Sequence, residues 1–306
     1  GLNGFIFFPA FLPWNKEKES VLNFDDLSEA KSKDEKNFLG VLKLDVDNLG
    51  IIFNHENLNS ISRLSSLSRM MGYFFDGFVN KIIKDEFSKK IYPIFSGGDD
   101  TFVVGNYHSI LKFTRNLREK FKKFTAENPS FTFSASIQII NPKQSVSRFS
   151  KIAEKLLEKG KSFIYPEDRT ALKDKIVLFG FPFTGKEYNY MQEIYGCLID
   201  LIQEKNESRA ILHKIAKSSI GLGSILEDKK KGFFKPQKVW RLSYYLRSMK
   251  SDNHKARDKL IEIYEKVATS LESTVKNPNF LLAAVRIAEL KTRKKQRGNN
   301  ESIQTK

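Results

Sequence analysis

Cysteine is almost absent from this chain of 306 residues, in which Cys197 is the single thiol. One cysteine excludes a disulfide framework within the chain and a zinc site built from several thiolates. Histidine is also scarce, and the four residues stand beside no recognisable motif; they are His55, His108, His213 and His254. We therefore expect a protein of the reducing cytoplasm whose chemistry does not depend on thiolates or imidazoles.

Long hydrophobic runs are missing as well. A membrane-spanning helix needs about 20 consecutive apolar residues, and no segment approaches that length. The opening segment through Pro13 is apolar, but two prolines interrupt it and no basic region precedes it. We interpret it as a strand or connector and not as a signal peptide, and we expect a soluble protein without a membrane partner.

Aromatic residues and positive charge are what the chain has in excess. The 26 phenylalanines and the hydrophobic content of 40% are typical of a folded chain with a large core. The 52 basic and 36 acidic residues leave a formal net charge of +16. Such a field favours polyanionic partners, namely RNA, DNA or nucleotide phosphates. The alternative is a general lysine bias of the composition, although local clustering of the charge favours a polyanion.

The apolar residues of the first 180 positions alternate between strand-like and helix-like spacing. The predicted elements are, in chain order, strand 38–44, helix 60–87, strands 91–95 and 101–104, helix 109–125, strand 131–139, helix 146–161 and strand 176–179. A strand, a helix, a hairpin, a helix and a strand in this order make the split βαβ or ferredoxin-like arrangement. The fold class that we predict is α+β, with a ferredoxin-like palm of the nucleotidyl-cyclase or polymerase type over residues 37–181.

The pattern changes after Pro182, where strand signals vanish and helical periodicity continues. We expect an all-α helical domain over residues 182–292. Residues 1–36 are predicted to form an N-terminal connector with a strand and a polar loop, and residues 293–306 a basic, disordered tail.

Acidic residues mark two strand ends of the predicted palm. Asp45 ends the first strand, and Asp99 and Asp100 lie in a Gly-Gly-Asp-Asp turn between the two hairpin strands. The ferredoxin-like topology puts the first strand next to the hairpin, so these carboxylates should crowd one edge of the sheet. They would repel one another, and hard divalent cations relieve such repulsion.

This arrangement predicts a two-metal site. Two Mg²⁺ or Mn²⁺ ions roughly 3.5–4 Å apart could activate a 3′-hydroxyl and stabilise a leaving pyrophosphate. Gly97 and Gly98 carry no side chains, so a triphosphate could approach the backbone there. The alternative is an ordinary hairpin turn with two solvated acids, which becomes less favoured once the acid at the end of the buried strand is considered.

Two motifs carry a resemblance to a known family. The segments Leu44–Gly50 and Phe95–Gly105 look like the second palm of the large, cyclase-like subunit of type III-A (Csm-type) CRISPR effector complexes. The similarity continues through Ser134–Ile137, Glu154–Lys161 and Lys238–Arg247, and so covers nearly the whole chain. The resemblance implies an antiviral nucleotidyltransferase that makes cyclic oligoadenylates from ATP when the complex binds target RNA through its guide RNA.

The resemblance also implies roles for individual residues. Asp45 and Asp99 resemble the metal ligands, and Val46 would add its carbonyl oxygen. Asp100 would be a further ligand or a support for the second ion. All three aspartates are predicted to be catalytic.

Nucleotide contacts are implied for a second group of residues. Asp47 would orient the loop and Asn48 would contact the nucleotide, together with Gly97 and Gly98 in the turn. Lys161 resembles a phosphate-contacting lysine, although a solvated cation at a helix end is an equal alternative. Ser134 is the last member of this predicted nucleotide site, and it could equally be a plain strand residue.

The chain departs from the family pattern in several places. Ser136 stands where the family usually has Gly, and Gly160 where it usually has Ala. The family's His-Asp nuclease, first palm and cysteine-rich zinc region have no counterpart in this sequence. We therefore expect the C-terminal half of such a subunit, cut or encoded separately, without a DNA-cleaving centre and dependent on the missing first palm for full activity.

Cations and aromatic residues interleave in the predicted helical domain. Lys229, Lys230, Lys231 and Lys235 are predicted to contact RNA or the small helical subunits that the resemblance implies as partners. Nearby Trp240, Tyr244 and Arg247 share one helical face, which favours packing in a core over RNA binding.

Two other functions remain open at this point. A diguanylate cyclase shares the palm but has Gly-Gly-Asp-Glu-Phe at its turn, whereas this chain has Gly-Gly-Asp-Asp-Thr. A non-catalytic scaffold that binds RNA and small subunits is the other alternative, although the intact aspartates argue against it.

Overall fold

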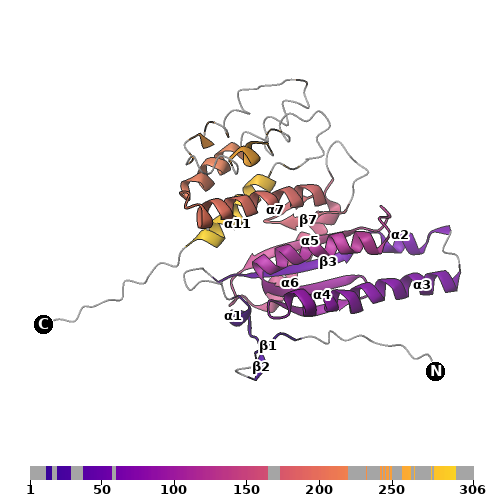
Figure 1. Cartoon of the computed structure of the whole chain (residues 1–306). Helices are drawn as coiled ribbons and strands as arrows, with labels where there is room; N and C mark the ends of the chain where they lie inside the picture. Colours follow the sequence, from indigo (N-terminus) through magenta and orange to yellow (C-terminus); the bar gives the residue numbers. More distant parts are fainter. Residues whose placement is uncertain are drawn as a thin grey trace.

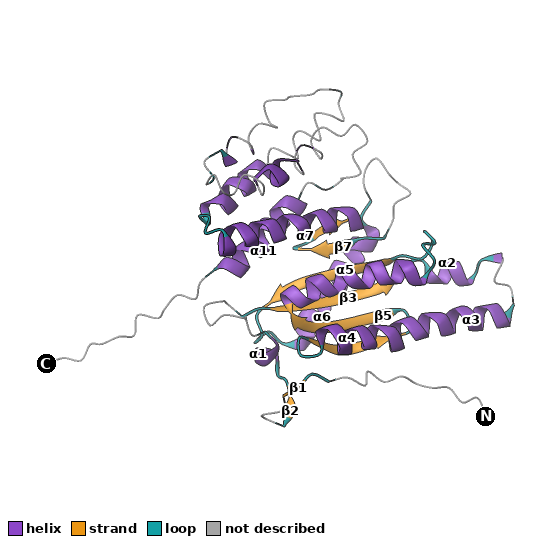
Figure 2. Ribbon diagram, viewed as in Figure 1, coloured by secondary structure: helices purple, strands orange, loops and turns teal. Residues whose placement is uncertain are grey.

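The computed structural model shows a mixed sheet with helices on both faces, followed by a mainly helical part (Figures 1 and 2). The residues that it describes are 12–15, 19–28, 37–56, 60–164, 173–219, 232, 242, 244, 246–247, 249, 257–262, 265, 277 and 279–293. The start of the predicted connector, half of the predicted polar loop and nearly all of the predicted basic tail lie outside these residues.

Six strands form the main sheet (Figure 2). Their spatial order is β4 (Ile91–Gly97), β5 (Asp100–Asn106), β3 (Leu39–Val46), β6 (Phe133–Ile140), β7 (Ile176–Leu178) and β8 (Phe181–Phe183). All neighbours are antiparallel except the parallel pair β6–β7. The order of the first four strands is that of a ferredoxin-like sheet, so the predicted palm topology is confirmed. Two short strands, β1 (Trp14–Asn15) and β2 (Ser20–Val21), pair separately before the four-residue helix α1 (Phe24–Leu27).

Helices cover the two faces of this sheet unequally (Figure 1). One face is covered by α3 (Ile61–Gly72), the π-helical segment η2 (Tyr73–Phe78), α4 (Val79–Phe87) and α5 (Tyr107–Phe124), and the other by α6 (Val146–Ser162). Alternation along β3 explains this division, because Leu42 and Leu44 belong to the larger core cluster and Val41 to the smaller one that contains Phe149 of α6. The polar residues of β3 at positions 43 and 45 therefore lie on the α6 face.

The helical part rests directly on the palm. Helix α7 (Gly185–Ile199) places Tyr188 in the larger core, where its hydroxyl donates a hydrogen bond to the carbonyl oxygen of Leu111 in α5 at 3.0 Å. Helix α11 (Phe280–Thr292) packs along α7 (Figure 1) and contributes to the same core. Among the described residues, no helix has both the length and the apolar character needed to cross a membrane.

The predicted end of the palm at residue 181 falls inside β8, which was not predicted from the sequence. β7 and β8 form a hairpin, and Val177 pairs with Pro182. A three-residue strand with a central proline gives almost no strand signal, because proline is depleted in strands and tolerated mainly at sheet edges. β8 is the edge strand of this sheet, so the proline does not interrupt the hydrogen bonding of a central strand.

Candidate active site

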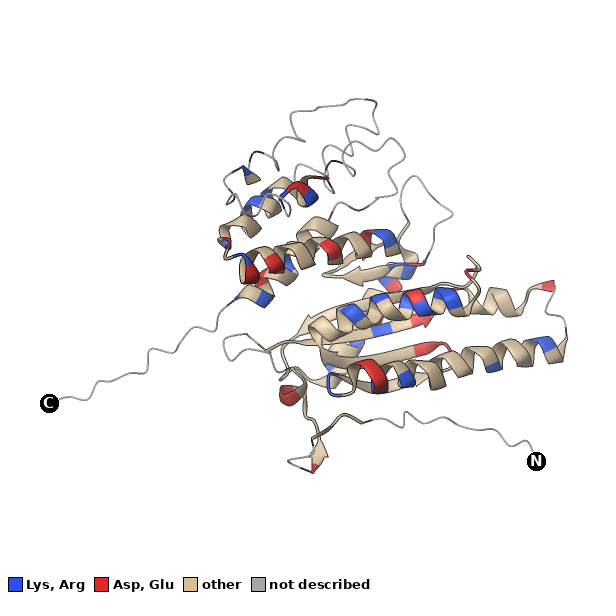
Figure 3. Ribbon diagram, viewed as in Figure 1, with Lys and Arg blue, Asp and Glu red and all other residues tan. Residues whose placement is uncertain are grey.

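The strand register brings the predicted catalytic acids together. Asp45, near the end of β3, is the direct cross-strand partner of Asp100 on β5 and of Ser134 on β6. Direct partners in an antiparallel pair have Cβ atoms roughly 4.5–5.5 Å apart on the same face. The predicted meeting of a strand end with a distant turn is therefore confirmed. Figure 3 shows in red the acidic residues of the chain, some of which lie at ends of the sheet's strands.

A tight turn carries the third acid. Gly98 and Asp99 form the two-residue loop between the paired residues Gly97 and Asp100. Gly98 has a φ of +66°, a conformation that glycine adopts without steric cost. The backbone N–H of Val46 donates to the carbonyl oxygen of Asp99 at 3.1 Å, which fixes the tip of the hairpin to the end of β3.

Two lysines compensate part of the negative charge. Lys161, in the last turn of α6, places its Nζ 2.6 Å from Oδ2 of Asp45. Lys43 lies 3.9 Å from Oδ2 of Asp100 and also forms an ion pair with Glu154 of α6. The structure therefore brings Lys161 to the predicted site, and it adds Lys43 and Glu154, which the sequence did not single out.

The carboxyl group of Asp100 is only partly compensated. Burial raises the pKa of its carboxyl group, nearby Lys43 lowers it, and the charges of Asp45, Glu154 and Asp99 raise it further. Its Oδ1 atom is buried and has no hydrogen-bond partner. A buried carboxylate oxygen of this kind fits a divalent cation, which would satisfy the oxygen and favour its charged form.

The three carboxylates, however, are not already gathered into a metal site. In the part of the chain that the structure describes, no group of three or more acid, imidazole or thiol side chains is arranged for a metal ion before one binds. The residues fit an ion that takes a few carboxylates from the protein and its other ligands from substrate phosphates and water, which is how Mg²⁺ is usually bound. Asp45, Asp99, Asp100 and the carbonyl group of Val46 stay the predicted ligands.

Asp47 and Ser134 are buried next to this surface. Both side chains are fully buried, and Asp47 accepts hydrogen bonds from Ser134 Oγ at 2.7 Å, Thr132 Oγ1 at 2.8 Å and the backbone N–H of Asp174 at 2.9 Å. Burial raises the pKa of the Asp47 carboxyl group, and the three hydrogen bonds lower it in part. Neither side chain is open to a nucleotide in this structure, and their predicted nucleotide contacts stay predictions. The loop-orienting role suggested for Asp47 agrees with its position.

Asn48 is partly exposed and has left-handed backbone dihedrals, with φ 57° and ψ 20°. Asparagine tolerates this region better than most residues. Asn48 precedes the short helix α2 (Leu49–Phe53), and its side chain forms no capping hydrogen bond to that helix. Its predicted contact with the nucleotide stays a prediction.

Comparison with known proteins places this site in a family. A family model described as Cas10/Cmr2, second palm domain, matches residues 38–170. A curated protein of Methanocaldococcus jannaschii is 34% identical in an alignment of 221 residues that covers 66% of this chain and 28% of that protein. It is named CRISPR system single-strand-specific deoxyribonuclease Cas10/Csm1 (subtype III-A). The chain belongs to the Cas10 family.

Solved Csm1–Csm4 cassettes share the fold of this Cas10 chain. One in complex with pppApApA aligns with a TM-score of 0.65 at 18% identity, covering 92% of this chain and 40% of that one. Cassettes in complex with cA4 and with one ATP each align with a TM-score of 0.60, at 18% and 20% identity, covering 93% and 94% of this chain and 40% of each. The chain thus spans less than a third of the curated relative and about two fifths of these structures.

The hairpin turn of this Cas10 palm depends on an acid that sequence reasoning missed. Asp76, in η2, accepts a hydrogen bond from the backbone N–H of Gly98 at 3.1 Å, and burial raises the pKa of its carboxyl group. A Cβ atom at Gly97 would lie 2.7 Å from Oδ1 of Asp76, so only glycine leaves room for this contact. The hydroxyl of Ser96 donates to the carbonyl oxygen of Phe75 at 2.6 Å and ties the same hairpin to η2.

One signal in the sequence could have pointed to Asp76. It is an acid among the apolar residues of a helix that also carries Phe74, Phe75 and Phe78. The π-helical geometry of η2, which occurs often at functional sites, is visible only in the structure.

The basic and aromatic segment of the helical part is only partly described. Lys229, Lys230, Lys231 and Lys235 lie outside the described residues, as does Trp240. Tyr244 is 57% exposed, and the guanidinium of Arg247 lies 4.0 Å from the centre of its ring. The predicted packing of Tyr244 in a core is therefore wrong. Among the described residues of this segment, Leu242 and Leu246 are buried, and each lies two positions from Tyr244, on the opposite side of a helical repeat.

Proposed function

We propose that this chain carries the second palm of a nucleotidyltransferase that joins ATP molecules into linear or cyclic oligoadenylate within a type III CRISPR effector complex. The observation on which the proposal depends is the pairing of Asp45 with Asp100 beside the glycine turn, where one buried carboxylate oxygen has no partner. Relatives of the same fold bind ATP, pppApApA and cA4, which are compatible with a substrate, an intermediate and a product of this reaction.

The residues of the chain suggest how such a site would work. Asp45, Asp99 and Asp100 would hold Mg²⁺ or Mn²⁺, and these ions would neutralise the phosphate charge and activate the attacking 3′-hydroxyl. Gly97 and Gly98 allow the triphosphate to approach the backbone, and Asp76 holds this turn in place. Lys161 neutralises Asp45 before the nucleotide binds and is close enough to the acids to exchange that contact for a phosphate oxygen.

The proposal includes partners that the chain does not contain. A palm that works across an interface would need a first palm for full activity, and the guide RNA, target RNA and small helical subunits would come from the complex. The cassettes of similar fold contain Csm4. We do not extend to these residues the deoxyribonuclease activity in the relative's name, because the four histidines of this sequence form no His-Asp pair.

A reconstitution experiment tests this function. The full chain is incubated with ATP and Mg²⁺ or Mn²⁺, with and without a partner that supplies the first palm and target RNA, and products are separated by chromatography. We expect oligoadenylate from the reconstituted pair and little or none from the chain alone. GTP replaces ATP in a parallel reaction, and conversion of GTP in preference to ATP would indicate a diguanylate cyclase instead.

Matched variants separate catalysis from scaffolding. Asp99→Ala with Asp100→Ala should abolish the product while leaving the fold intact. Asp25→Ala with Asp85→Ala makes the same charge change at two exposed positions on α1 and α4 and should retain activity. If the folded, reconstituted wild type makes no oligoadenylate, or if the Asp99 and Asp100 variant keeps its ATP and metal affinity, the chain is a scaffold and the proposal is wrong.

A further inference from the structure

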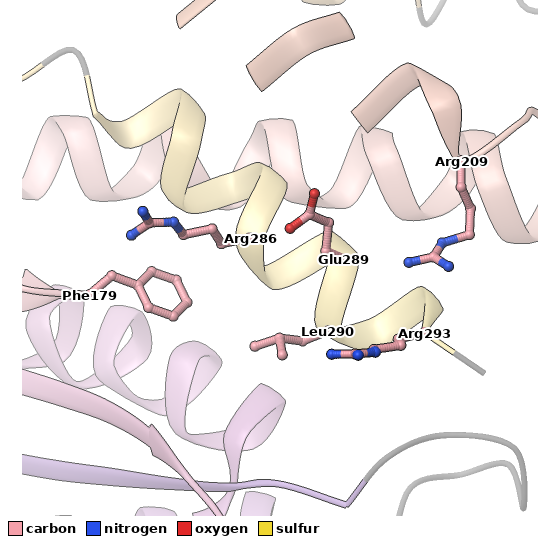
Figure 4. A pocket seen from close by; sticks show the side chains of 6 residues that line it. All are labelled: Phe179, Arg209, Arg286, Glu289, Leu290 and Arg293. Atoms are coloured by element: carbon pink, nitrogen blue, oxygen red, sulfur yellow. The ribbon is translucent and has the colours of Figure 1, made fainter. Parts of the chain in front are cut away.

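A pocket lined by arginines lies outside the aspartate site, between the turn that joins β7 to β8, the start of helix 210–219 and α11 (Figure 4). Its volume is about 420 Å³, within the range of roughly 300–1,000 Å³ typical of sites for small ligands. The residues that line it are Phe179, Arg209, Arg286, Glu289, Leu290 and Arg293.

The charge of this pocket is strongly positive. Its lining includes three guanidinium groups and one carboxylate, that of Glu289 (Figure 4). Arg209 donates from Nε to the hydroxyl of Thr292 at 3.1 Å, which holds its guanidinium at the rim while using one of its five N–H donors. Planar guanidinium groups bind phosphate oxygens in a bidentate manner, so the pocket suits a phosphorylated ligand.

An aromatic ring forms the opposite wall. The guanidinium carbon of Arg286 lies 5.7 Å from the centre of the Phe179 ring and 5.6 Å from that of Phe181. Figure 4 shows Arg286 directed toward the Phe179 ring from α11. Rings and guanidinium planes of this kind are surfaces on which unpaired bases stack.

Phe179 holds this position at a conformational cost. Its φ is 53° and that of Gly180 is 78°, so both central residues of the β7–β8 turn are left-handed. Asn or Gly is the usual choice at such a position, and a bulky residue there costs about 1–2 kcal/mol. Strained residues gather at functional sites, and this strain favours a role for the aromatic ring at the pocket beyond closing the turn.

We propose that this arginine pocket binds single-stranded RNA, with Arg209 and Arg293 on its phosphates and Phe179 as a stacking surface for one base. The net charge of +16 supports a polyanionic ligand, and the aromatic wall distinguishes a nucleotide strand from an acidic peptide. The pocket shares no residue with the aspartate site, so this proposal does not depend on oligoadenylate synthesis.

Fluorescence anisotropy of the full chain with a labelled, unstructured oligoribonucleotide tests the proposal over a range of salt concentrations. Arg209→Glu with Arg293→Glu should weaken binding at least 10-fold. It should also reduce the slope of log K against log salt by about 1.4, because each of the two lost phosphate contacts on a single strand contributes about 0.7. Phe179→Leu keeps an apolar side chain without a stacking face and should weaken binding roughly 5-fold or more.

The control variant is Lys81→Glu with Lys112→Glu, which makes the same charge change at exposed positions of α4 and α5. We expect less than a 3-fold effect. Equal losses from the control and the pocket variants would show a general charge effect and overturn the proposal. If the Arg→Glu variant is less stable to urea than the control, Arg209→Lys with Arg293→Lys replaces it, since it keeps the charge and should still lose several-fold in affinity.

Competition distinguishes other occupants of the pocket. If ATP or an acidic peptide displaces the labelled RNA at concentrations equal to those of unlabelled RNA, the pocket is a mononucleotide or protein site and the proposal is wrong. Asp99→Ala with Asp100→Ala should bind RNA like the wild type. The two proposals are told apart by two results. The pocket variants should lose RNA binding and keep oligoadenylate synthesis, whereas the aspartate variants should lose oligoadenylate synthesis and keep RNA binding.

Discussion

Replacing Asp47 with alanine should destabilise this protein strongly although the residue lies beside the candidate catalytic acids. The side chain is fully buried and accepts hydrogen bonds from two hydroxyl groups and one backbone N–H. Each buried donor left without a partner costs about 1–3 kcal/mol. Two effects offset part of this cost: the hydroxyl groups of Thr132 and Ser134 can rotate to other acceptors, and the buried carboxylate no longer has to be desolvated. We therefore expect the free energy of unfolding to fall by about 2–4 kcal/mol.

Asp47→Asn serves as the control because it keeps the shape and one carbonyl acceptor. It should cost about 1 kcal/mol or less, since the hydroxyl of Ser134 can accept a hydrogen bond from the new amide. Urea unfolding followed by circular dichroism measures both values, with an unchanged m-value as the sign that the same transition is compared. If the alanine variant is within about 0.5 kcal/mol of the wild type, the buried hydrogen bonds of Asp47 do not stabilise the fold and the reasoning is wrong. If a fully folded asparagine variant loses ATP affinity, the role of Asp47 is not purely structural.

The contribution of Asp47 to the stability of the wild type changes with pH in a definite direction. Burial raises the pKa of Asp47 above its ordinary value of 3.8, so the folded protein binds this proton more tightly than the unfolded chain does. The stability that Asp47 contributes is therefore complete below pH 3.8 and declines as the pH rises through the raised pKa of the folded state. The asparagine variant lacks this titration and should become more stable relative to the wild type as the pH rises from about 4 to 7.

Three further substitutions test other parts of the structure. Gly105→Ala should lower the free energy of unfolding by about 3 kcal/mol or more, because the added Cβ would collide with the backbone carbonyl oxygen of Lys90. The control Gly196→Ala lies at an exposed and open position in α7 and should be neutral or stabilising by up to about 1 kcal/mol. Equal changes in stability from the two substitutions would contradict the close packing at Gly105. Gly97→Ala should weaken ATP binding about 10-fold by displacing Asp76, and calorimetry showing unchanged affinity would exclude this role of the turn. Lys161→Gln should strengthen Mn²⁺ binding several-fold in the absence of nucleotide because it removes the cation from Asp45, whereas weaker Mn²⁺ binding would show that the lysine organises the site.

The chemistry of the palm follows from local patterns in the sequence. Apolar periodicity identifies each strand and helix, and their order leaves few topologies open. The meeting of Asp45 with Asp100 could be predicted for this reason, because in a ferredoxin-like sheet the first strand must lie beside the second strand of the hairpin. The resemblance to the large CRISPR subunit depended on the same two segments, since they hold the residues that the reaction would need.

Other features required the folded structure. Periodicity shows which face of an element is apolar, but not which distant residue meets its polar positions. Asp76 reaches a turn that lies 22 positions later, and Asp47 meets Ser134 across 87 positions. In the same way, Tyr188 of the helical part enters the palm's core.

Residues close together in the chain establish the order of the elements, the acidic strand end and the glycine turn, so these features can be read from the sequence. Which acids are exposed to a ligand and which are buried became visible only in the fold, as did the meeting of Phe179, Arg209, Arg286 and Arg293 in one pocket. Burial and charge compensation depend on neighbours from other elements. The free energy of those contacts is a property of the packed chain and not of any one segment.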